Sequence, residues 1–492
     1  MPTAHAGRRR LTFAVLAVSV SSFSLLQSLI VPVLTTIERE FATDQATVTW
    51  VLTAYLLSAS IATPLLGRIG DVVGKTRMLV VCLVALAVGS LLAALAPSIG
   101  WLIAARVVQG AGGGVLPLAF GIARDEFEDE VTRALSVLAS LTAVGFAFGI
   151  VLAGPIVDVT GYRGLFLLPM AATALAATAA LVFIPASPVR TPARLPLVPA
   201  VLLAVWLVAL LLALSEGNEW GWTSPRVLSL FAAAVLGTAA WVTVERRVPV
   251  PMIDMDMMRL RGIWTTNAVA GLVGFGMFAA FGFLPQFLQT PEAAGYGFGA
   301  SISESGWLLL PSAAMSFVVG FTVAPLIRRF GARLLIMAAA LIMSLTFFTI
   351  AAWHDSTWQL YLSTTAQGIG SGLVFSSLAG VVIASVPPEQ TGVASGMNAN
   401  IRTIGGSVGA AVMAGIVTAK HGPTGFPVES GYTVGFVVLG CCMLLAAGIA
   451  TLIPDIHQQA TGGRLADADN AELAYVPGAS GPGPSPTPDR VG

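Results

Sequence analysis

The amino-acid sequence predicts an all-α polytopic membrane protein with fourteen transmembrane helices. Three observations carry this prediction: 56% of the 492 residues are hydrophobic, only 10% are charged, and the mean hydropathy is +0.84. This composition is far too apolar for an ordinary soluble domain. A helix of about 20 apolar residues spans about 30 Å of hydrocarbon and satisfies its backbone hydrogen bonds internally. The long apolar runs of the chain are therefore expected to be membrane-spanning helices.

Fourteen apolar runs are long enough to span a bilayer. They lie at residues 11–35, 47–68, 77–97, 100–122, 133–156, 163–184, 197–214, 226–244, 263–288, 303–327, 333–352, 358–385, 392–419 and 432–453. The basic cluster Arg8–Arg10 before the first run is similar to the start of a signal peptide. Because that run is about 25 residues long and thirteen more follow, it is interpreted as a retained first helix.

The distribution of Lys and Arg predicts the orientation. With the N-terminus in the cytoplasm, nineteen of the twenty-five cations fall in cytoplasmic segments and only Arg39, Arg163, Arg226 and Lys420 fall outside. The even number of spans then places both termini in the cytoplasm. The excess of Arg over Lys and the abundance of Ala and Gly are typical of a GC-rich bacterial genome, so a bacterial plasma-membrane location is expected.

Several classes of function are disfavoured by the composition. A net formal charge of zero argues against a nucleic-acid partner. Cys82, Cys441 and Cys442 lie inside spans, where they are more readily explained as small buried residues than as disulfides or ligands. The sequence has no GxxxxGKS loop for ATP and no metal or nucleophile constellation. We therefore expect no enzyme activity, no metal, no cofactor and a monomer.

Short motifs recur at a nearly constant offset, which predicts an internal repeat. The matches are Gly74 with Gly331, Gln109 with Gln367 and Gly145 with Gly405, at offsets of 257, 258 and 260 residues. Helices 1 to 6 thus correspond to helices 9 to 14. The predicted organisation is a six-helix bundle at 1–185, two inserted helices at 186–262, a second bundle at 263–455, and a disordered cytoplasmic tail at 456–492 that is rich in Pro, Gly and Ser.

Three motifs carry a family resemblance that extends to about residue 455. They are the loop Gly67-xxx-Asp71-xx-Gly74-Lys75-x-Arg77 after helix 2, Arg106-xx-Gln109-Gly110 in helix 4, and Gly145-xxx-Gly149-xxxx-Gly154-Pro155 in helix 5. Together they resemble the fourteen-helix drug:proton antiporter branch of the major facilitator superfamily. The chain departs from that pattern at Ile150, where a Pro is usual, at Ala153, which replaces a Gly, and at Phe23, where many members carry an Asp. These departures concern proton coupling and leave the expected fold, two six-helix bundles with two inserted helices, unchanged.

The resemblance implies a gating role for the loop. Asp71 is expected to engage Arg124 or Arg77 and to face the start of helix 13 when the cytoplasmic side is closed. A carboxylate near a helix N-terminus gains about 0.3 to 1 kcal/mol. The alternative is a solvated charge that caps its own helix 3.

Two arginines lie within spans, and an unpaired cation there costs at least about 2.5 kcal/mol. Arg106, with Gln109 one turn further on, is expected to face a central cavity, and the resemblance implies a role in proton relay. The alternative is that Arg106 snorkels to the outer surface. Arg402 is expected to face the same cavity. Asn398 shares its helix face and either pairs with Arg402 or contacts substrate. Gln367 is a further cavity candidate.

The glycines of helix 5 and Pro155 favour close helix packing. The resemblance implies that this packing also seals the cavity against leakage. No Asp or Glu lies near the centre of a span, so the group that carries a coupled proton stays open among Asp71, Asp125, Asp158 and Glu304.

The leading hypothesis is a secondary active transporter that exports drugs, antibiotics or other amphiphilic molecules by alternating access, coupled to protons. Its expected partners are the small-molecule substrate, protons and the lipid bilayer. A facilitator-type carrier for a specific endogenous metabolite is the alternative. A transport-inactive scaffold or sensor is disfavoured, because an immobile protein has no need of the gating loop.

Overall fold

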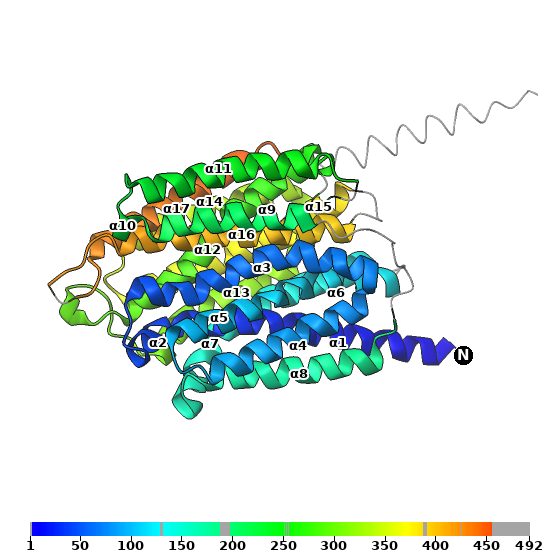
Figure 1. Cartoon of the computed structure of the whole chain (residues 1–492), viewed down its shortest axis with the longest axis horizontal. Helices are drawn as coiled ribbons and strands as arrows, with labels where there is room; N and C mark the ends of the chain where they lie inside the picture. Colours follow the sequence, from blue (N-terminus) through cyan, green and yellow to red (C-terminus); the bar gives the residue numbers. More distant parts are fainter. Residues whose placement is uncertain are drawn as a thin grey trace, which may run out of the picture. The chain divides into compact units, whose positions relative to one another are not determined.

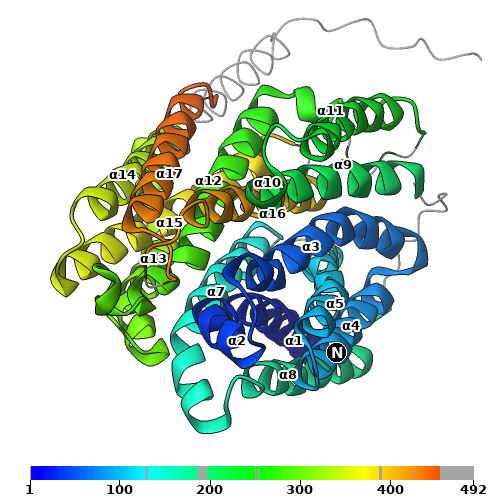
Figure 2. The ribbon, with the colours of Figure 1, turned by 60° about the vertical axis from the view of Figure 1, so that its left-hand side comes forward.

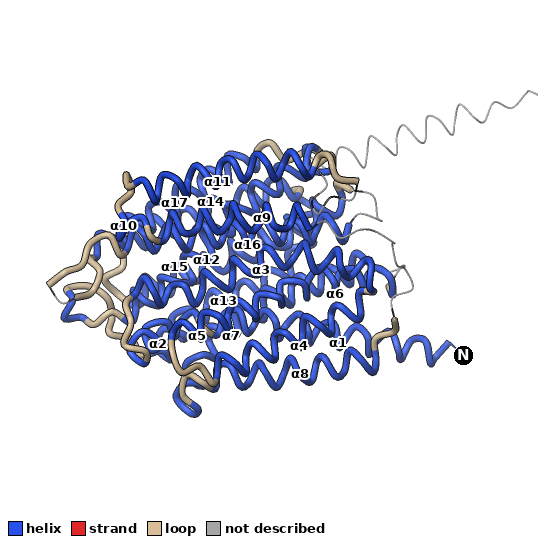
Figure 3. Tube along the Cα trace, in the orientation of Figure 1, coloured by secondary structure: helices blue, strands red, loops and turns tan. Residues whose placement is uncertain are grey.

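A computed structural model describes residues 2–127, 131–186, 197–249, 251, 253, 255–386, 391–423 and 425–454. In these ranges fourteen helices are long and apolar enough to cross a membrane, which confirms the predicted number. The described loops gather at the two ends of the helices (Figure 3). The predicted tail at 456–492 lies outside the described residues.

The first six spans form one group of helices (Figure 1). They comprise α1 (Pro2–Leu29) with α2 (Leu34–Glu40), α3 (Gln45–Val73), α4 (Lys75–Ala94), α5 (Ile99–Gln109) with α6 (Val115–Glu126), α7 (Val131–Thr160) and α8 (Gly164–Phe183). Two of the predicted single spans thus consist of two helical pieces. The first is interrupted at Val31–Val33, where Pro32 has no backbone N–H to donate.

The interruption of the fourth span is a 3₁₀ segment at Gly110–Gly114. Its glycines touch the neighbouring helices so closely that a side chain has no room. A Cβ on Gly110 would collide with Ser58 of α3, and one on Gly112 would collide with Leu86 of α4. Glycine is therefore required here for close approach, and the tighter helical turn follows from that packing.

The remaining spans comprise an inserted pair and a second group of six. The pair is α9 (Leu197–Ser215) and α11 (Pro225–Glu245), joined through the short α10 (Gly217–Trp220). The second group is α12 (Arg261–Gln289), α13 (Ile302–Phe330), α14 (Ala332–Ala352), α15 (Thr357–Ala384), α16 (Thr391–Val417) and α17 (Glu429–Ala450). The two groups and the pair are distinct in Figure 2.

The repeat is visible in the packing. Helix α7 packs against α1 of its own half and against α13 of the other half. Its counterpart α16 packs against α12 of its own half and against α3 of the other. The backbone contacts within each half are made at glycines: Gly149 of α7 meets Leu25 and Ser28, and Gly409 of α16 meets Phe275. Small residues at these positions allow the close helix contacts typical of membrane proteins.

The inserted pair breaks this symmetry. Helix α9 packs on α11 and also touches α16 and α3, so the pair covers one of the two boundaries between the halves (Figure 2). Helix α11 buries few residues against the rest of the chain, which indicates a largely lipid-facing helix. Residue boundaries for three separate domains stay a prediction.

Candidate functional site

The helices run between two ends, which we call the basic end and the far end. The basic end carries Arg68, Lys75, Arg77, Arg124 and Arg329. The far end carries Asp44, Asp158 and Ser303.

A cavity of about 480 Å³ lies between the two halves. Its volume is typical of sites that bind a small organic molecule. It extends toward the basic end, because part of its wall comes from the two turns of each helix nearest that end. These residues are Phe120, Leu135, Ile327, Ala384 and Ser395.

Aromatic side chains of the two halves meet in the wall of the cavity. The ring of Phe146 in α7 lies 5.6 Å from that of Phe278 and 4.9 Å from that of Phe281, both in α12. All three line the cavity. Two of these rings belong to one half and one to the other, so this contact depends on how the halves are oriented.

Beyond the aromatic rings, hydrogen bonds join the halves at the far end. Gln45 Nε2 donates to Gln286 Oε1 (2.6 Å), Thr35 Oγ1 donates to Gln289 Oε1 (2.5 Å), and Ser303 Oγ donates to Asp158 Oδ2 (2.6 Å). Gly154 lies at the same boundary, where its Cα faces the backbone of Ser303. The last glycine of the predicted helix 5 motif therefore packs across the halves, whereas Gly145 and Gly149 pack against α1 within the first half. Pro155, the next residue, is exposed.

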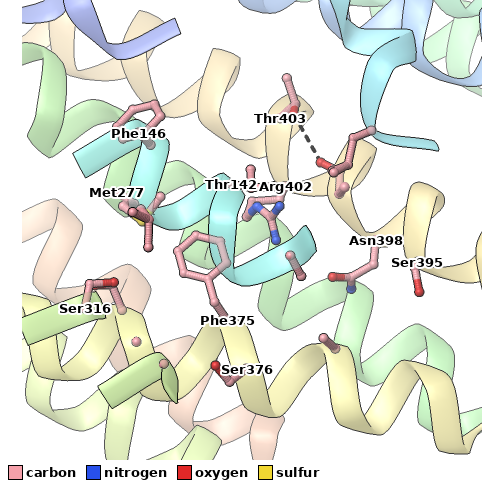
Figure 4. A pocket seen from close by; sticks show the side chains of 18 of the residues that line it. Thr142, Phe146, Met277, Ser316, Phe375, Ser376, Ser395, Asn398, Arg402 and Thr403 are labelled. Carbon is pink, nitrogen blue, oxygen red and sulfur yellow. Dashed lines mark hydrogen bonds between the residues drawn. The ribbon is translucent and has the colours of Figure 1, made fainter. Parts of the chain in front are cut away.

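Arg402 carries the only formal charge among the described residues that line the cavity. Its guanidinium carbon lies 4.6 Å from the centre of the Phe375 ring (Figure 4). The guanidinium makes no hydrogen bond or ion pair to any described residue. The pairing of Asn398 with Arg402, one of the two alternatives, is not formed. Asn398 Nδ2 instead donates to Asn267 Oδ1 of α12 at 2.9 Å. Both residues line or border the cavity as expected, but separately.

The predicted position of Arg106, facing the cavity or the outer surface, is wrong. Arg106 neither lines the cavity nor reaches the outer surface; its side chain is fully buried inside the first bundle. Its Nε donates to the carbonyl oxygen of Val51 (3.0 Å), its Nη1 donates to Gln109 Oε1 (2.7 Å), and its guanidinium stacks 4.3 Å from the Tyr55 ring centre. Gln109 in turn donates to Ser90 Oγ at 2.8 Å. Buried acceptors and an aromatic face thus stabilise this cation within its own bundle.

Gly110 and Gln367 also lie outside the cavity wall. Gly110 packs against α3, and Gln367 is buried in α15 without a hydrogen bond to a described residue. At the position equivalent to Arg106, Thr364 donates to the carbonyl oxygen of Leu308 at 3.0 Å. Arg106 and Thr364 therefore make the same interhelical contact in the two halves.

The gating loop differs from the prediction in its ion pairs. The carboxylate of Asp71 lies 3.8 Å from Arg68 on its own helix and makes no ion pair with Arg77 or Arg124 in the described part of the chain. Among the described residues, the Asp71 carboxylate accepts no hydrogen bond from α16. Arg77 is exposed. Gly74, with φ of 117°, forms the turn between α3 and α4 that only glycine adopts readily, and Gly67 rests against Pro117 of α6.

The buried ion pair of this region is Lys75 with Asp125, and sequence reasoning missed it. Lys75 Nζ lies 2.7 Å from Asp125 Oδ2 and 3.0 Å from Oδ1. The two residues are fifty positions apart, and the only sequence signal was a carboxylate at the basic end of helix 4, the helix that neighbours helix 3.

The comparisons with known proteins decide the family. The model of the Major Facilitator Superfamily matches residues 16–290 and 266–474. The chain belongs to the Major Facilitator Superfamily. As a member, it is a multi-pass transporter of the bacterial plasma membrane, and two six-helix bundles with two inserted helices are its fold.

Relatives of the chain include bacterial proteins named for drug resistance or antibiotic export. The chain is 30% identical over 401 residues to the multidrug resistance protein Stp of Mycobacterium tuberculosis, which covers 80% of this chain and 73% of that protein. It is 30% identical over 460 residues to the cephamycin export protein CmcT of Amycolatopsis lactamdurans, and the match covers 89% of this chain and 90% of that protein. It is 29% identical to the methylenomycin A resistance protein of Streptomyces coelicolor, covering 83% and 85%.

Solved structures agree on the superfamily fold. The human organic anion transporter MFSD10 aligns with a TM-score of 0.65 at 16% identity, covering 90% of this chain and 99% of that one. The xylose transporter XylE of E. coli, in a partially occluded inward-open conformation, aligns with a TM-score of 0.63 at 11% identity, covering 91% and 98%.

Proposed function

We propose that this superfamily member exports amphiphilic, drug-like molecules from the cytoplasm by alternating access. The observation that carries the proposal is the cavity between the halves, which is lined by aromatic and aliphatic side chains with scattered hydroxyl groups. Hydrogen bonds join the halves at the far end. Relatives named for multidrug resistance and antibiotic export support the same direction.

The concentration of Lys and Arg at the basic end favours a cytoplasmic location for that end. In this orientation the cavity faces the cytoplasm, and the far-end contacts close the outer side. Export then requires the halves to rock about the paired helices α7 with α13 and α3 with α16. The hydrogen bonds at Gln286, Gln289 and Ser303 break as the outer side opens.

Asp71 is the proposed latch of the cytoplasmic side. While the basic end is open, its carboxylate pairs only with Arg68 and stays partly exposed. Closure of that end would bring the loop toward the start of α16, where the helix dipole stabilises a negative charge. Proton coupling is proposed on family grounds, with the carboxylates at the helix ends as the available carriers.

The test is drug accumulation in a pump-deficient bacterium, with and without a protonophore. The strains carry empty vector, wild type, Asp71→Asn, or the control Arg226→Gln, which changes an exposed residue of the inserted pair. We expect lower accumulation with wild type and the control than with vector, and higher accumulation with Asp71→Asn. Equal accumulation in vector and wild-type cells across a broad panel contradicts export. Transport of only one compound, an endogenous metabolite, instead supports the alternative of a carrier for a specific metabolite.

A further inference from the structure

We infer that the cavity takes amphiphilic organic anions, with Arg402 as the residue that binds the acidic group. This inference rests on the proposed export function and names its substrate class. It starts from the contrast between the two arginines that lie at membrane depth.

Arg106 is stabilised by its surroundings. The Val51 carbonyl, the Gln109 amide oxygen and the Tyr55 ring surround its guanidinium, which is sealed inside one bundle. Its Nη2 has no hydrogen-bond partner among the described residues, but the side chain is fully buried and does not line the cavity.

Arg402 has no such partners. Its guanidinium borders the cavity between the halves, with the Phe375 ring as its one described interaction. A cation at membrane depth is costly unless an anion or water compensates it, so such residues mark binding sites. The described cavity wall contains no Asp or Glu to serve as a counterion. An acidic group on the molecule that enters the cavity would supply the counterion that the described wall lacks.

The charge is also confined to one half. By the offset of 260 that relates Gly145 to Gly405, the position equivalent to Arg402 is Thr142, which lines the same cavity. Thr142 Oγ1 donates to its own helix, at the Leu138 carbonyl (3.1 Å). Figure 4 labels both Thr142 and Arg402 among the residues of the cavity wall. The cavity thus has one cationic wall and one neutral wall.

The rest of the lining defines the other part of the ligand. Rings of Phe23, Phe146, Phe278 and Phe281 surround a mainly apolar space, and Ser312, Ser316 and Ser376 add hydroxyl groups. A planar guanidinium binds carboxylate or sulfonate in a two-point contact. The site therefore fits a molecule with one acidic group and an aromatic body, and it disfavours organic cations, which Arg402 repels.

The test uses two dyes that share one ring system. 8-Anilino-1-naphthalenesulfonate carries a sulfonate, and N-phenyl-1-naphthylamine lacks it. Their dissociation constants are measured by fluorescence on the full-length protein in phosphatidylcholine nanodiscs, with empty nanodiscs subtracted. We expect Arg402→Gln to weaken the sulfonate dye at least tenfold and to change the neutral dye less than twofold. Arg402→Lys should keep most of the preference, and the control Arg226→Gln should behave as wild type. A change below threefold for the sulfonate dye in Arg402→Gln, or a parallel loss of both dyes, overturns the inference.

A second measurement needs no variant. On wild type, 2-naphthoate should displace the sulfonate dye at a concentration at least tenfold below that needed with the neutral 2-naphthamide; equal potency overturns the inference. Phosphatidylglycerol in the nanodiscs should leave the dye affinity unchanged, whereas a large loss would assign Arg402 to a lipid headgroup instead of a cargo.

Transport of both dyes in vesicles separates the two proposals. Export of the sulfonate dye that is independent of Arg402 supports the function and contradicts the anion site, while Arg402-dependent anion binding without transport contradicts only the function.

Discussion

Lys75 and Asp125 form a buried ion pair between α4 and α6, with Nζ 2.7 Å from Oδ2 and only 6% and 8% of the two side chains exposed. Asp71 lies four residues before Lys75, yet its own pair with Arg68 is longer, at 3.8 Å, and its side chain is 34% exposed. The same short loop therefore contains Lys75, whose ion pair stabilises the bundle, and Asp71, whose carboxylate is available to move. Because both helices of the buried pair belong to the first half, the pair is expected to persist when the halves rock.

Neutralising one member of the buried pair should destabilise the protein. Asp125→Asn leaves the Lys75 ammonium buried without its counterion, and breaking such a pair costs about 3 to 5 kcal/mol. Melting in detergent should show a clear drop for Asp125→Asn. Asp71→Asn removes a partly exposed pair and should cost less than about 1 kcal/mol. Equal melting temperatures for the two variants would contradict the assigned burial.

Neutralising Asp71 should slow export without unfolding the protein. Asp71→Asn removes the charge that the proposed latch places at the start of α16, so the closed cytoplasmic side becomes less stable by about 0.3 to 1 kcal/mol or somewhat more. Initial export rates in vesicles should fall severalfold, and Asp71→Glu should recover part of the rate. The matched control is Arg68→Gln, which breaks the same local pair but keeps the carboxylate. Wild-type rates in Asp71→Asn would exclude the latch.

The glycines of α7 should separate into two classes. Gly149 packs against α1 within the first half, so Gly149→Val should lower the melting temperature, at a cost of about 1 to 3 kcal/mol from overpacking. Gly154 packs against Ser303 of the other half, so Gly154→Val should instead disfavour closure of the far end. Labelling of a cysteine placed at Ser395, in a background without the native cysteines, should report this change. We expect slower labelling in Gly154→Val as the basic end closes; unchanged labelling would show that the contact tolerates both states.

The Arg106 network should depend on geometry as well as charge. Gln109→Leu removes one acceptor from a buried guanidinium and should cost about 1 to 3 kcal/mol. Arg106→Lys keeps the charge but not the planar arrangement that reaches Val51 and Gln109 together, so it should also lower the melting temperature. Ser90→Ala, one step further along the network, should have the smallest effect. A wild-type melting temperature in Arg106→Lys would contradict the arrangement in which one guanidinium donates to both Val51 and Gln109.

The sequence was sufficient for the helices because membrane burial imposes length and composition on each of them separately. The repeat also predicted which helices correspond, and the glycines at 149 and 409 do contact neighbouring backbones. The orientation of individual polar side chains was harder to predict. Arg106 and Arg402 are both intramembrane arginines, yet one is buried inside a bundle and the other lines the cavity. This difference depends on helix rotation and on neighbours that are distant in the sequence. The partner of Lys75 was missed for the same reason.

In the proposed cycle of anion export, Arg402, the one cation among the described residues of the cavity wall, also makes transport sensitive to membrane voltage. With a monoanion bound, the site around Arg402 is neutral, whereas the returning, unloaded site carries one positive charge. In the proposed orientation a cytoplasm-negative potential draws that unloaded site back toward the cytoplasm. One charge that crosses the whole field gains about 2.3 kcal/mol per 100 mV. Electrical work alone could then drive the return step, without a proton-binding group in the cavity.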